Sequence, residues 1–183
     1  MKLVEQLFLN VSELSITNKP MLIGTILGSC VAVIIHVPRL KLSAICHARL
    51  PKGPCLLKKK HSFCYVDSAL DYMVSELYLL GAKRSELIVK AFGGSQVIFA
   101  AQNTMKNMRV NRKKSIGEQN IAALHRGLKK HGLHLVSYDL GGNRGRRLKY
   151  NTLNNEVLIK MINKGPVAMD EMGLLLNNFI FNR

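Results

Sequence analysis

The pattern of apolar and polar positions predicts several strands in the first third of the chain. The apolar, mostly β-branched run at 30–37 ends at Pro38 and is typical of a strand buried on both faces. The apolar segment 42–50 follows after a short turn and is predicted to be its hairpin partner. A looser alternation over 3–14 predicts an opening strand, and the segment 17–20, which contains proline, predicts a turn.

Apolar residues at helical spacing predict two helices. The first covers 65–80 and ends at Gly81, which can adopt the left-handed conformation of a helix C-cap. The second begins with a capping box formed by Ser115 and Glu118 and ends at about His131. The apolar face of the first helix is formed by Val66, Ala69, Leu70, Met73, Leu77 and Leu80.

The other apolar segments are short and are separated by sequences rich in Gly and Asn. Such sequences are typical of tight turns between strands. The predicted strands are 87–92, 133–140, 147–152 and 156–162. Consecutive strands joined by short turns favour an α+β fold, with mixed or antiparallel sheets layered against helices, over a doubly wound parallel sheet.

Length and composition fit a single domain. The chain has 183 residues, of which 48% are hydrophobic, enough to bury a sizeable core. We expect one domain over 1–163 and a C-terminal extension over 164–183, whose apolar segment 174–181 packs back on the domain or binds a partner. The apolar run at 30–35 is too short to span a bilayer and no signal peptide precedes it. We therefore expect a cytoplasmic protein that is not inserted in a membrane.

The chain is strongly basic. Lys and Arg number 27 against 11 Asp and Glu, which gives a formal net charge of +16. Charge of this size attracts polyanions such as nucleic acid, anionic lipid or acidic protein surfaces. Aromatic residues make up only 6% and Trp is absent, so the stacking platforms of single-strand binders are sparse. The charge therefore indicates electrostatic attraction without indicating the partner.

Four cysteines lie within one third of the chain: Cys30, Cys46, Cys55 and Cys64. A cytosolic setting argues against disulfides, and no C-x-x-C pair is present. A zinc site is one alternative, although structural zinc ligands usually come in closer pairs. That site would be formed by Cys46, His47, Cys55, His61 and Cys64. Reduced, buried thiols are the simpler interpretation, and we expect no bound metal.

Cys30 stands between a glycine turn and the predicted strand at 30–37. A cysteine nucleophile needs a base within hydrogen-bond reach, because few thiols are ionised at neutral pH. If the hairpin turn centres near residue 39, position 47 lies roughly opposite position 31, which brings His47 beside Cys30. His36 lies too far along the strand from Cys30 to do the same. On these residues alone, core packing and a Cys30–His47 dyad both remain open.

Several motifs resemble one family in order and spacing. They are "LGSCVAV", "CHARLP" in place of the more usual A-H-x-M-L-P, "GAKRSELIVKAFGG", "IGEQN" and "DLGGNRGRRLKYN". Together they run from about Thr25 to Ile162 and resemble the chemoreceptor glutamine deamidases (CheD). The resemblance implies an enzyme of bacterial or archaeal chemotaxis. Such an enzyme converts selected glutamines of methyl-accepting receptors to glutamate and releases ammonia.

The resemblance also implies a fold and a set of site residues. The fold would be similar to that of glutamine-deamidating bacterial toxins, with Cys30 as the nucleophile and His47 as the base. Thr25 would complete a triad, although the family's threonine often stands six residues before the cysteine, where this chain has Gly24.

Backbone N–H groups around Gly28 and Ser29 would bind the oxyanion, and no cofactor or metal is needed. The glycine pairs at 93–94 and 141–142 are not followed by G-K-[ST] and are expected to form turns rather than a phosphate loop.

Expected partners follow from the same resemblance. They are the receptor helical hairpins, which are rich in Glu; the sequence does not decide whether a CheC-type phosphatase also binds. We expect a monomer that does not bind nucleic acid. The basic segments 58–60 and 109–114 would attract the acidic receptors. Two other functions remain open: a non-catalytic chemotaxis adaptor that binds a CheC-type phosphatase, and a basic nucleic-acid-binding domain, which would bind DNA with steep salt dependence.

Overall fold

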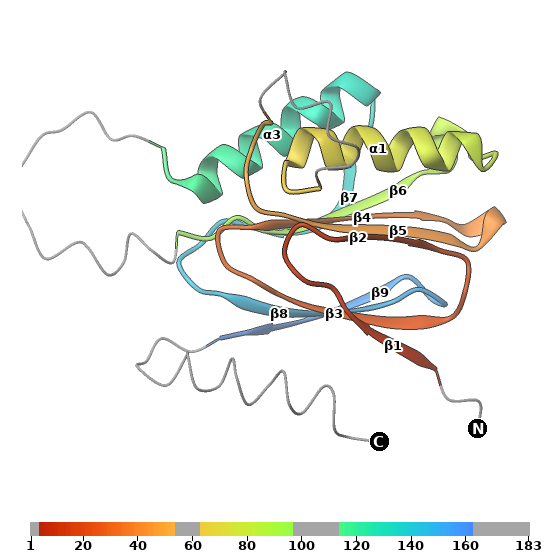
Figure 1. Cartoon of the computed structure of the whole chain (residues 1–183), viewed down its shortest axis with the longest axis horizontal. Coiled ribbons are helices and arrows are strands. Elements are labelled where there is room, and N and C mark those ends of the chain that lie inside the picture. Colours follow the sequence, from red (N-terminus) through yellow and green to blue (C-terminus); the bar gives the residue numbers. More distant parts are fainter. Residues whose placement is uncertain (1–3, 54–62, 97–113, 163–183) are drawn as a thin grey trace, which may run out of the picture.

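Two β-sheets lie face to face, and two helices cover the outer face of one of them (Figure 1). The computed structural model describes residues 4–53, 63–96 and 114–162. Within these ranges the layers run in the order helices, five-stranded sheet, four-stranded sheet. This arrangement confirms the predicted α+β class, and both described helices lie on the same side of the molecule.

Each sheet is mixed. The five-stranded sheet has the order β2 (Leu14–Thr17), β5 (Leu42–Ala48), β4 (Val31–Val37), β6 (Ile88–Gly93), β7 (Leu135–Leu140). The four-stranded sheet has the order β1 (Glu5–Phe8), β3 (Met21–Leu27), β8 (Arg146–Asn151), β9 (Glu156–Met161). The pairs β6–β7 and β1–β3 are parallel, and the other pairs are antiparallel.

Strand β4 is the centre of the molecule, and all its residues are buried. Its side chains alternate between two cores, as the two-residue period of a strand requires. Val33 and Ile35 pack toward the helices, whereas Ala32 and Ile34 pack toward the four-stranded sheet. The prediction of a strand buried on both faces is confirmed.

Both predicted helices are present as α1 (Val66–Leu79) and α3 (Ile116–His131). The capping box of α3 forms as predicted: the Ser115 hydroxyl accepts from the Glu118 N–H at 3.2 Å, and the Glu118 carboxylate accepts from the Ser115 N–H at 2.7 Å. Leu80 is 50% exposed rather than buried, because α1 ends at the residue before it. The rest of the predicted apolar face of α1 is buried.

The predicted opening strand over 3–14 is wrong. The chain instead forms β1, turns through Ser12 at φ 69°, and enters β2 in the other sheet. A single strand cannot serve two sheets, so the segment must break where it crosses between them. Strand β3 follows after the turn at 17–20, and no element had been predicted for it.

Some predictions fall outside the described residues. These are the basic segment 58–60, the basic segment 109–114 except for Lys114, and the extension 164–183. Within the described parts of the chain, neither helix is both long and apolar enough to cross a membrane.

Candidate active site

Cys30 and His47 lie on the same face of the five-stranded sheet. His47 pairs with Ala32, and Val31 pairs with Ala48, so the predicted pairing of position 47 with position 31 is off by one residue. The turn contains a short 3-10 segment followed by Lys41 at φ 52°, which moves the centre of the hairpin. The shift decides whether Cys30 and His47 lie on one face. Cys30 is two residues from Ala32, so it shares the face of Ala32 and of its partner His47. If His47 had paired with Val31 instead, its side chain and that of Cys30 would lie on opposite faces.

Cys30 is half-buried at the start of β4 and packs against the core between the sheets. Burial raises the pKa of its thiol, and the nearby positive charge of Arg49 opposes part of that effect. The backbone N–H of Cys30 also stabilises the thiolate. Because burial dominates, the resting thiol keeps its proton at neutral pH.

The backbone of His47 is held along one edge by the β1–β2 connection. Its N–H donates to the Glu13 carbonyl at 2.9 Å, and its carbonyl accepts from the Ser12 N–H at 2.8 Å. The side chain is buried, with 2% of the residue exposed. Burial lowers the pKa of the imidazole, while the Leu9 carbonyl and Glu13 act in the opposite direction. The ring is therefore neutral at neutral pH.

Thr25 reaches His47 across the space between the sheets. Its hydroxyl donates to the Leu9 carbonyl at 2.8 Å and lies 2.8 Å from Nδ1 of His47. A hydroxyl has one proton, so Oγ1 accepts from His47 and Nδ1 carries the ring proton. This fixes Nε2 as the unprotonated nitrogen of His47.

Nε2 of His47 is buried and has no hydrogen-bond partner among the described residues. A buried nitrogen without a partner costs free energy, so such atoms in a folded protein call for an explanation. Since the ring is neutral and Nδ1 is protonated, this atom is a free proton acceptor. This nitrogen lies on the face of the sheet that also carries Cys30.

The segment before β4 is held by the loop that follows β6. The Gly28 carbonyl accepts from the Ser95 N–H at 2.9 Å, and the Cys30 carbonyl accepts from the Gly94 N–H at 2.7 Å. Gly93 adopts φ +111°, and a Cβ there would lie 2.1 Å from the Cys30 oxygen. Only glycine allows this approach. The glycine pair at 93–94, predicted as a turn, instead lies at the end of β6, and its backbone sets the position of the Cys30 backbone.

Asn120 was missed as a site residue in the sequence. Its Nδ2 donates to the Ser29 carbonyl at 2.8 Å and to the Arg49 carbonyl at 2.9 Å. The motif "IGEQN" contains it, but a motif alone does not tell which of its residues reaches another segment. The contact depends on how α3 packs on the sheet.

The glycine turn at 141–142 contacts the end of β6 and the residues that follow it. The Gly142 carbonyl accepts from the Gln96 N–H at 2.8 Å, and the Gly141 N–H donates to the Gly93 carbonyl at 2.8 Å. Arg146, which is buried, donates to the carbonyls of Asp139 and Gly141 and pairs with the Asp139 carboxylate at 2.9 Å. Both glycine pairs therefore support the backbone around Cys30.

The zinc alternative does not fit the hairpin. Cys46 packs toward the helices, whereas its neighbour His47 faces Thr25 in the other sheet. Adjacent residues of a strand point to opposite faces, so these two cannot share one metal ion. Two of the other proposed ligands, Cys55 and His61, lie outside the described residues.

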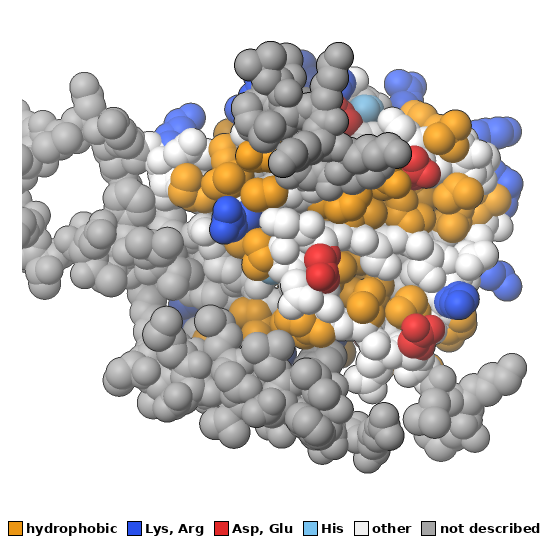
Figure 2. Space-filling model, viewed as in Figure 1, with side chains coloured by type: hydrophobic (Ala, Val, Ile, Leu, Met, Phe, Trp, Pro, Cys, Tyr) orange, Lys and Arg blue, Asp and Glu red, His pale blue; other side chains and the backbone are white. Residues whose placement is uncertain are grey.

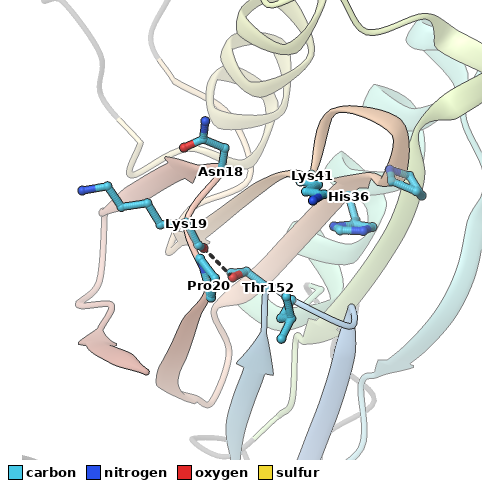
Figure 3. A pocket seen from close by; sticks show the side chains of 8 residues that line it. Asn18, Lys19, Pro20, His36, Lys41 and Thr152 are labelled. Carbon is cyan, nitrogen blue, oxygen red and sulfur yellow. Dashed lines mark hydrogen bonds between the residues drawn. The ribbon is translucent and has the colours of Figure 1, made fainter. Parts of the chain in front are cut away.

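A cavity of about 460 Å³ lies at the far end of β4 (Figure 3). It is lined by His36 and Lys41 near the hairpin turn, and by Thr152, whose hydroxyl donates to the Lys19 carbonyl at 2.8 Å. Six residues of extended strand separate Cys30 from His36, roughly 20 Å at 3.3 Å per residue. This cavity is therefore separate from the Cys30 region. His36 lies too far along β4 to contact Cys30, as predicted.

The basic charge is spread rather than concentrated on the face shown in Figure 2. Lys and Arg side chains are scattered around a band of hydrophobic ones, with few acidic side chains between them. Of the two basic segments expected to attract receptors, only Lys114 lies within the described residues, where it is exposed.

Comparisons with known proteins agree on one family. The family model described as "CheD chemotactic sensory transduction" matches residues 50–161, a range that begins after Thr25, Cys30 and His47. A relative from Maridesulfovibrio salexigens, named "Probable chemoreceptor glutamine deamidase CheD", is 34% identical over 165 residues, covering 88% of this chain and 94% of the relative. Another from Halalkalibacterium halodurans, "Chemoreceptor glutamine deamidase CheD", is 33% identical over 159 residues, covering 84% and 92%.

One solved structure overlaps the chain in part. The Bacillus licheniformis hypothetical protein YfiH matches with a TM-score of 0.45 and 12% identity, over 69% of this chain and 50% of that one. The family assignment rests on the sequence relatives, which match over most of both chains. By these matches, and by the family model over 50–161, the chain belongs to the CheD family.

Proposed function

We propose that this protein is a glutamine deamidase that acts on chemotaxis receptors, with Cys30 as nucleophile, His47 as base and Thr25 as the residue that orients His47. The names of its relatives support the substrate class. The residue roles are supported by the position of His47, whose buried Nε2 lies on the face of the sheet shared with Cys30. This Nε2 has no hydrogen-bond partner among the described residues, the Cys30 thiol included, so the two side chains must approach each other before a proton can pass between them.

The chemistry begins from a neutral pair. Nε2 of His47 takes the thiol proton as the sulfur of Cys30 attacks the carboxamide carbon, and the carbonyl electrons move to the oxygen. When this intermediate collapses, the C–N bond breaks and His47 gives its proton to the nitrogen, so ammonia leaves and a thioester remains. Water then attacks the thioester with His47 as base. The proton returns to the sulfur, and the product is glutamate.

Backbone N–H groups near Ser29 and Cys30 stabilise the oxyanion. The Gly28 carbonyl accepts from the Ser95 N–H of the loop after β6, and in a trans peptide this directs the Ser29 N–H away from that loop. The enzyme supplies these donors from its own backbone. The mechanism uses no redox step and transfers only protons and an acyl group.

The test is deamidation of a purified receptor cytoplasmic fragment, followed by ammonia release and by peptide mass spectrometry. Cys30→Ala and His47→Ala are expected to abolish both signals. Cys64→Ser is the matched control, because Cys64 is also half-buried and lies close enough to influence Cys30 electrostatically. Ammonia release that survives in Cys30→Ala would overturn the proposal, as would DNA binding with steep salt dependence in a protein that leaves receptors unmodified.

A further inference from the structure

Asn120 is a buried polar side chain that the chemical steps above do not use. It lies in the second turn of α3 and is 0% exposed. Asparagine is a poor helix former, and a buried amide is costly unless its hydrogens are bonded. Both hydrogens of Nδ2 are bonded, one to the Ser29 carbonyl at 2.8 Å and one to the Arg49 carbonyl at 2.9 Å, whereas Oδ1 has no partner among the described residues.

The two carbonyls that Asn120 binds flank the candidate site. Ser29 directly precedes Cys30, and Arg49 stands two residues after His47. Since Val31 pairs with Ala48, the next positions outward are Cys30 and Arg49. One side chain from the helix layer therefore holds both strands of the hairpin at the point where regular pairing ends.

The bond to the Ser29 carbonyl sets the direction of the Cys30 N–H. In a trans peptide the C=O of one residue and the N–H of the next point in opposite directions. Helix α3 covers one face of the sheet, whereas Cys30 packs on the other face, between the sheets. Holding the Ser29 carbonyl toward α3 therefore turns the Cys30 N–H toward the side on which the Cys30 sulfur lies.

The position of Asn120 is itself fixed by close packing. A Cβ at Gly117 would lie 2.3 Å from the Gly94 oxygen, so the first turn of α3 rests directly on the loop that binds Cys30. Asn120 comes three residues later, on the same side of the helix. Backbone groups hold the carbonyls of Gly28 and Cys30, whereas a side chain holds the carbonyl between them. That third contact is the one that substitution can remove.

We propose that Asn120 is a positioning residue, which holds the Ser29–Cys30 peptide so that the Cys30 N–H can stabilise the oxyanion of the reaction. The inference rests on the proposed function of the site and deepens it. Asn120 acts from behind the sheet, through the backbone. It therefore affects the rate of the reaction rather than the binding of the receptor.

The test compares Asn120→Ala with Leu124→Ala, one turn further along the same helix and equally buried. Asn120→Ala is expected to lower kcat on the receptor fragment about tenfold to a hundredfold, with KM unchanged. It is also expected to slow alkylation of Cys30 at neutral pH, followed by peptide mass spectrometry. Leu124→Ala loses core packing and thermal stability, but is expected to keep both kcat and the alkylation profile.

A second variant covers the case in which Asn120→Ala does not fold. Asn120→Asp has nearly the same shape, and its protonated form keeps one donor. We expect its kcat relative to wild type to fall as pH rises and the carboxyl loses that proton. A folded Asn120→Ala with wild-type kcat would overturn the inference, and so would Asn120→Asp with wild-type kcat at every pH. Losses of kcat and of Cys30 alkylation in Leu124→Ala equal to those in Asn120→Ala would also overturn it. If wild-type protein releases no ammonia, the proposed function fails, whereas the alkylation comparison still tests the position of Cys30.

Discussion

Replacing Thr25 by valine tests the proposed proton path with almost no change in shape. The side chain is 1% exposed, and valine fills nearly the same volume, so no cavity is created. What is lost is a hydroxyl that makes two contacts of 2.8 Å, one to the Leu9 carbonyl and one to Nδ1 of His47. Without it, Nδ1 of His47 loses the hydroxyl at 2.8 Å that accepts its ring proton.

The size of the effect follows from those two contacts. A buried polar group left without a partner costs about 1–3 kcal/mol. We expect Thr25→Val to lose about 2 kcal/mol of unfolding free energy, since the Leu9 carbonyl also interacts with His47 and can take over part of the role. Because a base with its proton on the wrong nitrogen cannot accept another there, kcat should fall about tenfold to a hundredfold.

Two controls separate catalysis from stability. Thr25→Ser keeps the hydroxyl and should keep most of the activity. Thr152→Val removes another buried hydroxyl, which accepts from the Met21 N–H at 2.8 Å and donates to the Lys19 carbonyl at 2.8 Å, at the far end of the sheets. It should lose stability and keep kcat. Ammonia release gives the rates, and nitrogen NMR of His47 reports the tautomer. Full activity in Thr25→Val, or a ring proton on Nε2 in wild type, would refute the reasoning.

Three further predictions concern pH and backbone geometry. First, kcat/KM should fall as pH drops through an apparent pKa below 6.5, because burial lowers the pKa of His47. With rising pH, kcat/KM should not fall until above 9.0, because burial raises the pKa of the Cys30 thiol. A decrease on the alkaline side that begins below pH 9.0 would indicate a resting ion pair instead. Second, Gly93→Ala should lower kcat, since its Cβ would lie 2.1 Å from the Cys30 oxygen. The control is Gly81→Ala, where φ is +88° and an added Cβ would meet no described atom within 4 Å. It should cost only backbone strain of about 1–3 kcal/mol. Third, burial and the charge of Lys90 lower the pKa of His36 below 6.5. The unfolded chain therefore binds more protons, so His36 stabilises the fold above pH 6.5, and this contribution is lost as pH falls through the folded pKa. His36→Asn should flatten the slope of Tm against pH in this range.

Local patterns predicted the elements whose signals lie within a few residues. The capping box of Ser115 and Glu118 needs only its own turn, and it forms as expected. The two-faced burial of β4 follows from its composition, because an apolar strand with no polar face must be covered on both sides. These features do not depend on what the distant parts of the chain do.

Features that depend on long-range packing were missed or shifted. The hairpin register changed by one residue because of a turn geometry at Lys41 that sequence does not specify. The contact of Thr25 with His47 exists only because two sheets face each other. Asn120 contacts Ser29 across 91 positions of sequence, which no local period can indicate. The spacing of the hairpin left a Cys30–His47 dyad open, and the family resemblance added Thr25 and the role of each residue, whereas their geometry required the fold.

A neutral resting pair suits the hydrolysis of an amide better than a preformed ion pair would. The leaving nitrogen must be protonated, so the base has to carry a proton at the moment the C–N bond breaks. In a buried site an imidazolium is costly on its own, which is why His47 is neutral before the reaction. In the proposed mechanism, an oxyanion lies nearby once the sulfur has attacked, and the imidazolium is no longer the only charge in the site. The charge on His47 therefore forms when the intermediate can stabilise it, and the proton is available at the step that needs it.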